Sequence, residues 1–413
     1  MSKVNECLKK SRLYNFNSRQ GIRVMLGIPK EINLSELKHD LDKCYSYFYI
    51  MKPQKIKSTE TKEDRIERYL SLDEPLDIFD TRPDDYSKDK YRMLININEK
   101  WLKTTLKRIN KMLSSSLIKK ENKNIDYPIP YLHSSIKKRS YTTNVEFHKN
   151  NKYLLTIDIQ NFYPSISYEK IINFFRHELN LEKDIAEIYT ALCTCPIDDP
   201  IVNPKKYGIG QGLATSPLLA YLSNYRMFDY IYELAQKENI EMTVYVDDVI
   251  FSSDKEIPQN FINKLFGIVK RNGLNIKKSK VKIYGPNQIK KVTGLCITTG
   301  GKIKVPNSKH EEVKYQYLYL SKMLLEINNM TDYFDFYNLF LKFKGNVQFI
   351  NLVEGNVSSK YTKFVDDYNQ YFLYGVKKIK KACKYSKDNI SSNDYAKFVK
   401  KYENLRKIVD TFK

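Results

Sequence analysis

The feature that most constrains this chain is a pair of adjacent aspartates inside an apolar run, in the segment VYVDDVIFSS at residues 244–253. The flanking Val, Ile, Tyr and Phe residues favour strands, so the segment predicts a β-hairpin with Asp247 and Asp248 at its bend. Aspartate is also common in ordinary turns, because it tolerates turn conformations. The dipeptide alone therefore does not distinguish a site from a turn.

A second stretch, FVDDYNQ at residues 364–370, carries nearly the same tetrapeptide. Its surroundings differ, because aromatic residues recur there at helical spacing and predict one apolar helix face: Tyr361, Phe364, Tyr368 and Tyr371. Asp366 and Asp367 lie off that face, and we expect them to be surface charges.

The net charge of +22, from 70 Lys+Arg against 48 Asp+Glu, indicates a polyanionic partner, with nucleic acid as the first candidate. A generally lysine-rich proteome would also produce such a charge. No apolar run of about 18 residues is present and the N-terminus lacks a secretory pattern, so we expect no membrane span and a cytoplasmic location. The six cysteines are scattered, which agrees with a reducing compartment and predicts no zinc site.

Hydrophobic periodicity predicts an α+β fold. Residues 152–159 and 278–284 favour strands, and residues 101–117, 168–180, 182–193 and 257–273 favour helices. Ser216 and Pro217 predict the start of one long helix that continues to residue 236. The chain after residue 310 is expected to be largely helical.

Asp158 ends the run LLTID, so it and the two hairpin acids are carboxylates at the ends of neighbouring strands. Such groups repel one another unless they bind divalent cations. Two Mg²⁺ ions about 4 Å apart are what nucleotidyl transfer requires, one to activate the attacking hydroxyl and one to stabilise the leaving pyrophosphate. Asp158, Asp247 and Asp248 are therefore the candidate metal ligands.

Three segments in this order, TIDIQNFYPSI, GIGQGLATSPLLAYLSN and YVDD, resemble the palm motifs of reverse transcriptases. KYRMLI resembles the first fingers motif and places Arg92. Residues 133–148 resemble the retron segment that ends in Asn-Ala-x-x-His, with Val145 in the alanine position. GLNIKKS resembles the Asn-x-x-Lys-Thr/Ser motif, and VTGL resembles the retron Val-Thr-Gly signature. The resemblance extends over residues 90–310 and includes these retron-type features.

This resemblance implies a right-hand polymerase with fingers, a palm built on an antiparallel sheet with the YVDD hairpin, and a helical thumb. The expected domains are an N-terminal extension (1–85), fingers (86–150), palm (151–300, with fingers helices inserted around 170–210) and thumb (301–413).

The resemblance also implies roles for individual residues. Asp158, Asp247 and Asp248 would be catalytic, and the backbone carbonyl of Ile159 would complete the metal shell. Tyr163 would exclude a ribose 2′-OH, although either Phe162 or Tyr163 could be a core aromatic. The remaining nucleotide-binding candidates are Gln211, Gly212, Arg139 (with Lys137 and Lys138 as rivals, or all three in a solvated loop) and Lys278.

The RNA-binding candidates implied by the retron motifs are Asn144, His148, Val292, Thr293 and Gly294. A structural role for His148, hydrogen-bonded at a fold junction, is the alternative. The C-terminal helices combine aromatic residues and lysines and could grip a template–primer duplex. The alternative is that they are amphipathic core helices of a lysine-rich protein.

The implied activity is RNA-directed DNA polymerisation with Mg²⁺ (or Mn²⁺), dNTPs and a structured RNA template or primer, yielding cDNA, in anti-phage defence. A toxin or other effector partner and an oligomer are compatible with this reading. Two alternatives stay open: an abortive-infection enzyme making non-templated or protein-primed DNA, and an inactive RNA-binding scaffold.

Overall fold

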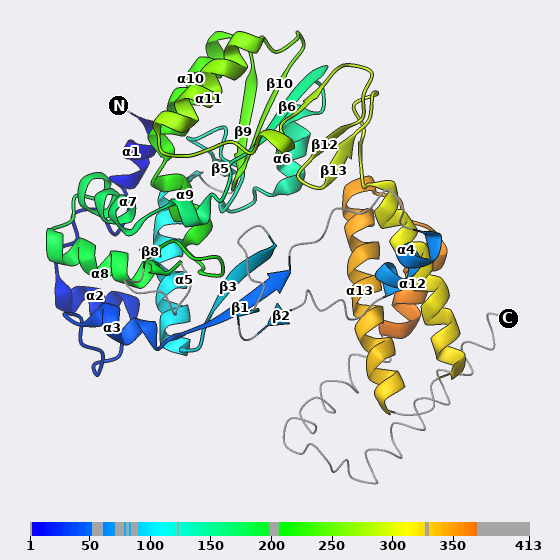
Figure 1. Ribbon diagram of the computed structural model, residues 1–413, viewed down its shortest axis with the longest axis horizontal. Coiled ribbons are helices and arrows are strands. Elements are labelled where there is room, and N and C mark those ends of the chain that lie inside the picture. Colours follow the sequence, from blue (N-terminus) through cyan, green and yellow to red (C-terminus); the bar gives the residue numbers. More distant parts are fainter. Residues whose placement is uncertain are drawn as a thin grey trace. The chain divides into compact units, whose positions relative to one another are not determined.

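The computed structural model describes residues 2–51, 61–70, 78–79, 82–83, 90–121, 124–197, 206–326 and 330–369. The chain forms two compact units (Figure 1). Unit 1 comprises residues 1–52 and 77–303, and unit 2 comprises residues 53–76 and 304–413. Helices and antiparallel sheets occur together, as the α+β prediction requires. The expected extension over residues 1–85 is not one body, because residues 1–52 belong to unit 1 and residues 53–76 to unit 2.

The centre of unit 1 is a four-stranded antiparallel sheet of order β11-β6-β10-β9. Its strands are β6 (Tyr153–Asp158), β9 (Glu241–Tyr245), β10 (Asp248–Ser253) and β11 (Lys282–Tyr284). Helices α10 (Tyr225–Lys237) and α11 (Gln259–Arg271) lie on one side of the sheet, and α6 (Tyr141–His148) lies on the other (Figure 1).

Alternation along β10 directs its side chains to these two sides. Phe251 packs edge-on against Phe261 of α11, with ring centroids 5.3 Å apart. Ser252 faces α6, where its hydroxyl lies 2.7 Å from His148 Nδ1. The strands are thus held by an apolar layer on one face and by α6 on the other.

A second antiparallel sheet, of order β2-β1-β3, lies in the part of unit 1 that contributes residues 1–52 and 77–97. Its strands are β1 (Tyr45–Met51), β2 (Ile78–Phe79) and β3 (Tyr91–Ile97). The surrounding elements are α1 (Lys3–Leu8), α2 (Arg19–Leu26), α3 (Leu37–Asp42), α5 (Lys100–Ser116), α7 (Tyr168–Asn173), the π-helical turn η2 (Phe174–Glu178) and α8 (Lys183–Cys193). One continuous cluster of buried apolar side chains, from Val4 to Leu274, joins these elements to the central sheet.

The expected long helix after Ser216 is two helices, α9 (Ser216–Leu222) and α10. Thr215, not Ser216, is the N-cap residue, and Ser216 Oγ instead donates to the Gly210 carbonyl at 2.7 Å. The break falls at Asn224, whose side-chain amide donates to the Ala220 carbonyl at 2.8 Å. Asn side chains compete with the backbone for hydrogen bonds in this way and so interrupt helices.

Short strands and 3₁₀ turns complete unit 1. These are the pairs β4 (Lys119–Glu121) with β5 (Asn124–Asp126) and β7 (Cys195–Pro196) with β8 (Tyr207–Gly208), the sheet β12 (Lys290–Val292), β13 (Leu295–Ile297) and β14 (Ile303–Lys304), and the turns η1 (Tyr163–Ser165) and η3 (Lys278–Lys280).

Unit 2 is helical and contains α4 (Lys62–Leu70), α12 (Asn307–Glu326), α13 (Met330–Glu354) and a helical segment at 359–369. The aromatic face predicted around FVDDYNQ is buried here: Phe364 and Tyr368 pack against Phe336 and Phe340. Asp366 is exposed as expected, whereas Asp367 is half-buried with Oδ2 enclosed. Tyr371 lies outside the described residues.

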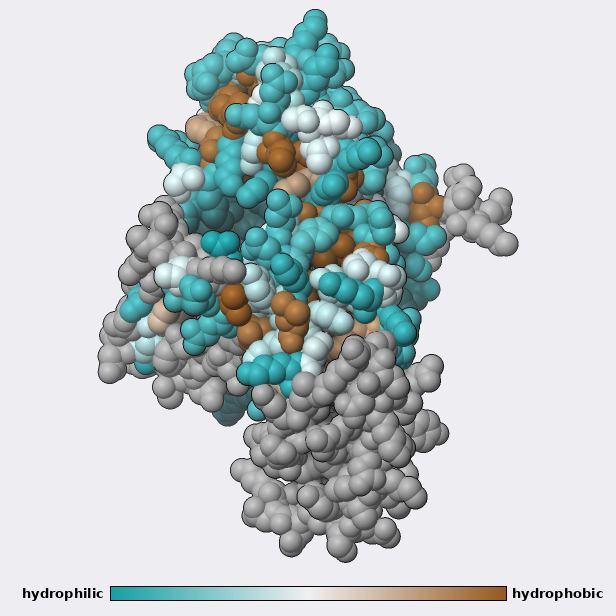
Figure 2. Space-filling view, turned by 90° about the vertical axis from the view of Figure 1, so that its right-hand side faces the viewer, coloured by the Kyte–Doolittle hydropathy of each residue, from teal (hydrophilic) through white to brown (hydrophobic). Residues whose placement is uncertain are grey.

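None of the described helices is long and apolar enough to cross a membrane. The coloured part of the face in Figure 2 is largely hydrophilic, with apolar areas between polar and charged side chains.

Candidate active site

Three aspartates lie at one end of the central sheet. In the register of β6 and β10, Asp158 lies directly opposite Asp248. Residues that face each other across an antiparallel ladder project to the same side of the sheet. Asp247 precedes Asp248 in the hairpin, and its carbonyl accepts a hydrogen bond from Ile159 N at 3.0 Å. The backbone register therefore brings Asp158, Asp247 and Asp248 to the same end of the sheet.

The hairpin bend is a two-residue turn, because Tyr245 pairs directly with Asp248. Val246, its first residue, has φ of +58°, a left-handed conformation that costs energy for a β-branched side chain. Val246 N donates to Ser134 Oγ at 3.1 Å, which holds the strained turn from outside the hairpin.

The carboxylates repel one another in a partly buried setting. Burial, followed by the neighbouring Asp247 and Asp158, raises the pKa of Asp248 to about 6. Burial and Asp158 also raise the pKa of Asp247, against the lowering influence of Lys280 and Arg92. The Lys280 ammonium lies 2.5 Å from Asp158 Oδ2.

Carboxylate oxygens are the ligands that hard divalent cations prefer, so the donor set fits such an ion in kind. The spatial arrangement of these carboxylates fits an ion less well than their chemistry does. Within the part of the chain that the structure describes, no three His, Cys, Asp or Glu side chains converge on one point closely enough to hold an ion. Lys280 is the group that contacts Asp158 instead.

The two neighbouring aromatic residues that follow β6, Phe162 and Tyr163, lie in different environments. Phe162 is buried and packs edge-on against Phe228, so it belongs to the core. Tyr163 is half-buried on the site side, where burial and Asp247 raise the pKa of its hydroxyl. Arg92 on β3 interacts electrostatically with both Tyr163 and Asp247. Arg92 is thus a cation at the site, a position that its motif alone did not reveal.

The glycine-rich segment at 208–212 packs against β3. The carbonyl of Gln211 accepts a hydrogen bond from Ile95 N at 2.8 Å. Gly212 has φ of +121°, and a Cβ added there would lie 2.1 Å from the Ile95 carbonyl oxygen. Glycine is therefore required here for the close approach of two backbones of the chain itself.

Arg139 does not face the carboxylates. Its guanidinium donates to the carbonyls of Ile129, Pro130 and Leu132 and stacks on the Tyr127 ring, with Cζ 4.1 Å from the centroid. These contacts engage Arg139 in holding its own loop, and the phosphate contact predicted for it does not fit this placement. The rivals Lys137 and Lys138 are exposed.

The retron-like motifs at 144–148 and 292–294 lie together, although Val292 follows His148 by 144 positions in sequence. Thr293 Oγ1 donates to the Tyr141 carbonyl at the start of α6, and α6 also packs against β13. Thr293 and Gly294 both have positive φ, 42° and 85°, as a two-residue hairpin turn of this class requires.

The side chains of Asn144 and His148 are fully buried, so the predicted RNA contacts by these two side chains are not compatible with the fold. His148 lies between the hydroxyls of Ser252 and Thr243, each at 2.7 Å, and burial lowers its pKa to about 3. His148 therefore has a structural role, which is the alternative to RNA binding. Val292 is buried as well, which leaves Thr293 and Gly294 accessible in this motif.

Lys278, the lysine of the Asn-x-x-Lys-Ser motif, is an exposed residue of η3. Lys280, two residues later, is the one that contacts Asp158. Both belong to the same lysine-rich run, and its sequence contains no signal that distinguishes them.

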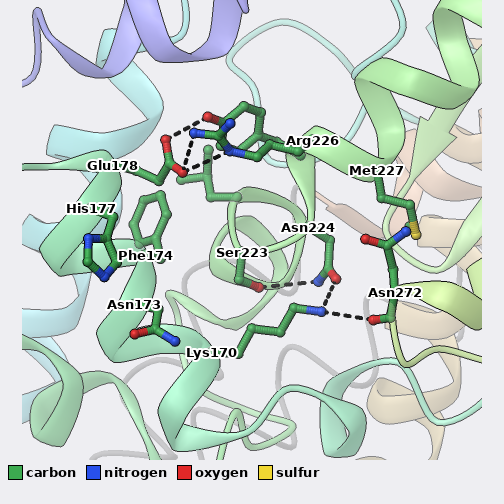
Figure 3. Close-up of a pocket in the computed structure, with 12 residues that line it drawn as sticks. Lys170, Asn173, Phe174, His177, Glu178, Ser223, Asn224, Arg226, Met227 and Asn272 are labelled. Atoms are coloured by element: carbon green, nitrogen blue, oxygen red, sulfur yellow. Dashed lines mark hydrogen bonds and ion pairs between the residues drawn. The ribbon is translucent and has the colours of Figure 1, made fainter.

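A cavity of about 240 Å³ lies elsewhere in unit 1, lined by residues of α7, η2, α9 and α10 together with Asn272 (Figure 3). Lys170 crosses it and donates to Asn224 Oδ1 and the Asn272 carbonyl, at 2.5 and 3.4 Å. Glu178 binds Arg226 through Nε and Nη2. None of the three aspartates lines this cavity, and its polar groups link helices.

Comparisons with known proteins agree with the motifs. Residues 82–317 match the family model described as "Reverse transcriptase (RNA-dependent DNA polymerase)". The chain is 29% identical over 220 residues to the retron Se72 reverse transcriptase of Salmonella heidelberg (strain 579083-10), covering 52% of this chain and 53% of that protein. It is 29% identical over 182 residues to the retron Ec86 reverse transcriptase of Escherichia coli, covering 43% and 52%. The chain thus spans about half the length of these curated relatives.

A solved structure of telomerase from Candida albicans, in complex with a TWJ fragment of telomeric RNA, aligns with a TM-score of 0.34 and 13% identity, covering 56% of this chain and 46% of that one. The family model is the broader match, since it covers more than half of the chain. Its fold is the right-hand polymerase, with which the mixed helices and antiparallel sheet agree. The chain therefore belongs to the reverse transcriptase (RNA-dependent DNA polymerase) family.

Proposed function

We propose that this protein is an RNA-directed DNA polymerase of retron type, which extends a primer with dNTPs along an RNA template. The observation that carries the proposal is the pairing of Asp158 opposite Asp248 at a strand end, with Asp247 beside them in the hairpin. Carboxylates gathered in this way suit in-line nucleotidyl transfer.

Reverse transcriptases depend on divalent cations. We assign the ligands to the carboxylates of Asp158, Asp247 and Asp248 and to the Ile159 carbonyl, with Mg²⁺ as the proposed ion and Mn²⁺ as a substitute of similar ligand preference. When bound, such ions lower the pKa of the primer hydroxyl and stabilise the leaving pyrophosphate.

Arg92 and Tyr163 are the proposed contacts for the incoming nucleotide, together with Gln211 and Gly212. Arg92 combines an exposed guanidinium with electrostatic contact to Asp247, so it replaces Arg139 as the proposed triphosphate ligand. Tyr163 is positioned by its buried neighbour Phe162 and would exclude a ribose 2′-OH by its bulk. Lys278, a nucleotide-binding candidate, is proposed either to contact a phosphate or to act as a general acid on the departing pyrophosphate.

The RNA is proposed to contact the exposed turn at Thr293 and Gly294 and the basic, aromatic helices of unit 2. The charge of +22 supports binding to a polyanion and predicts that affinity falls with added salt. We place the enzyme in the cytoplasm, where the described cysteines would stay free thiols as they are here. The proposal also includes an effector protein as a partner of the enzyme and an oligomeric state for it.

The look-alike motif supplies a matched control for the test. Asp247→Asn and Asp248→Asn should each lower primer extension on an RNA template by at least about 10³-fold, because each removes a ligand of the reacting centre. Asp366→Asn removes the same charge from the exposed acid in FVDD and should leave extension unchanged. If the Asp247 and Asp248 variants extend the primer as well as wild type does, the catalytic assignment is wrong. If wild type itself extends no primer, the inactive-scaffold alternative is supported instead.

We further propose that the product is a short templated cDNA joined to its own RNA, as the retron relatives suggest, and that it serves anti-phage defence. Sequencing the DNA made in cells tests this point. A unique cDNA that matches one RNA is the expected result, whereas repeats or random homopolymer would favour the abortive-infection alternative.

A further inference from the structure

Lys280 is placed at the carboxylates by the backbone around it. Gln160 N donates to the Asn275 carbonyl at 2.7 Å, and Lys277 N donates to the Asp158 carbonyl at 3.0 Å. These two bonds fasten the segment before η3 to the chain at the end of β6. The following strand, β11, pairs with β6 in turn, so both flanks of Lys280 are fixed.

The 3₁₀ turn then selects which lysine faces Asp158. A 3₁₀ helix has three residues per turn, so residues two positions apart point in clearly different directions. Lys280 Nζ reaches Asp158 Oδ2 at 2.5 Å. Lys278, two positions earlier in the same turn, is exposed. Asp158 is largely buried, with 11% of its side chain exposed, while the Lys280 side chain is 54% exposed.

Such an ammonium cannot stay in place once a divalent cation binds the same carboxylate, because two cations a few ångströms apart repel strongly. We propose that Lys280 is a built-in counter-ion that competes with the divalent cation for Asp158 and thereby sets the metal affinity of the site. The long, exposed lysine stem allows the ammonium to swing into solvent while the backbone stays fixed. This inference rests on the proposed metal site and goes beyond it, since it concerns how that site is regulated.

Lys282 offers a stringent control. It follows Lys280 by two residues, lies opposite Thr156 in the ladder and so faces the same side of the sheet as Asp158. Lys280→Met and Lys282→Met remove the same charge from the same segment, but only the first removes an ion-pair contact with Asp158. The difference in metal affinity between the two variants therefore measures the effect of the ion pair with Asp158, and not the general effect of removing one positive charge from the protein.

The experiment is a titration of the full-length protein with Mn²⁺, without RNA or nucleotide, in which free Mn²⁺ is measured by electron paramagnetic resonance. Lys280→Met should bind Mn²⁺ about three- to tenfold more tightly than wild type, somewhat more than an exposed pair would give, because Asp158 is largely buried. Lys282→Met should change affinity less than twofold, and Lys280→Arg, which keeps the charge, should stay close to wild type.

Equal affinities in Lys280→Met and Lys282→Met, or weaker binding in Lys280→Met, would overturn the inference and leave the proposed activity intact. Failure of the metal site itself gives a different result. If Asp158→Asn binds Mn²⁺ as wild type does, the metal assignment is wrong. The proposed competition between Lys280 and the cation for Asp158 is then wrong as well.

Discussion

Asp248 and His148 both have pKa values displaced by burial, and the displacements have opposite signs. The pKa of Asp248 is raised from its ordinary value of 3.8 to about 6. Between these two pH values the native state holds a proton that the unfolded state has released, so stability falls as the pH rises from 3.8 to about 6. The pKa of His148 is lowered to about 3, so the unfolded state takes up a proton first, and stability is lost as the pH falls below about 6.5.

His148→Gln should isolate the histidine contribution, because glutamine keeps a neutral hydrogen-bonding side chain between Thr243 and Ser252. Between pH 7 and 5 the free energy of unfolding should fall less steeply in the variant than in wild type, by up to about 1.4 kcal/mol per pH unit. Urea denaturation at several pH values measures this slope. His177→Gln, at an exposed position, is the control, and parallel curves for His148→Gln and wild type would contradict the assignment.

Single residues also mark where prediction from sequence succeeds. The carboxylates could be placed because strand alternation and a short hairpin are local properties, and both survive in β6, β9 and β10. Arg139 and Lys280 could not be placed, because each lies in a lysine-rich run and its direction depends on distant carbonyls or carboxylates. The burial of Asn144 depends likewise on how α6 packs on the sheet.

Among the elements, helices α5, α8 and α11 follow from periodicity alone, whereas the break between α9 and α10 does not. Asn224 at that break accepts a hydrogen bond from Lys170, 54 residues earlier in the chain. The glycine-rich segment is a similar case, because its partner β3 lies more than 100 residues upstream. A long-range partner decides the local conformation in both elements.

Gly212→Ala should disrupt the packing of the glycine-rich segment on β3. The added Cβ would meet the Ile95 carbonyl, and the φ of +121° is unfavourable for alanine, so a loss of about 1–3 kcal/mol in stability is expected. A rise in the KM for dNTP should accompany it. Gly285→Ala is the matched control, because a Cβ there has no neighbour within 4 Å. Equal thermal stability of the two variants would refute the required close approach.

At the scale of the whole molecule, each unit has its own core. The large apolar cluster of unit 1 ends at Leu274, whereas unit 2 is built around stacked and edge-on aromatic rings such as Phe336, Phe340 and Phe364. Helix α4 belongs to unit 2 although it precedes most of unit 1 in sequence. A polar network fixes it there: Gln316 Nε2 donates to the Tyr69 carbonyl and to Glu312, and Asn346 Nδ2 donates to Gln316 Oε1.

Gln316→Ala should therefore weaken unit 2 selectively. The substitution removes the hydrogen bonds that Gln316 makes with the Tyr69 carbonyl, Glu312 and Asn346, which costs about 1–3 kcal/mol in total. Hydrogen exchange followed by mass spectrometry should show lower protection in α4, α12 and α13 and unchanged protection in β6 and β10. Asp248→Asn is the reciprocal control: without metal ions at pH 8 it removes carboxylate repulsion and should raise protection in β6 and β10 only. If Gln316→Ala lowered protection equally in both sets of elements, the two cores would unfold as one cooperative body, and the division of the chain into separate units would not describe its stability.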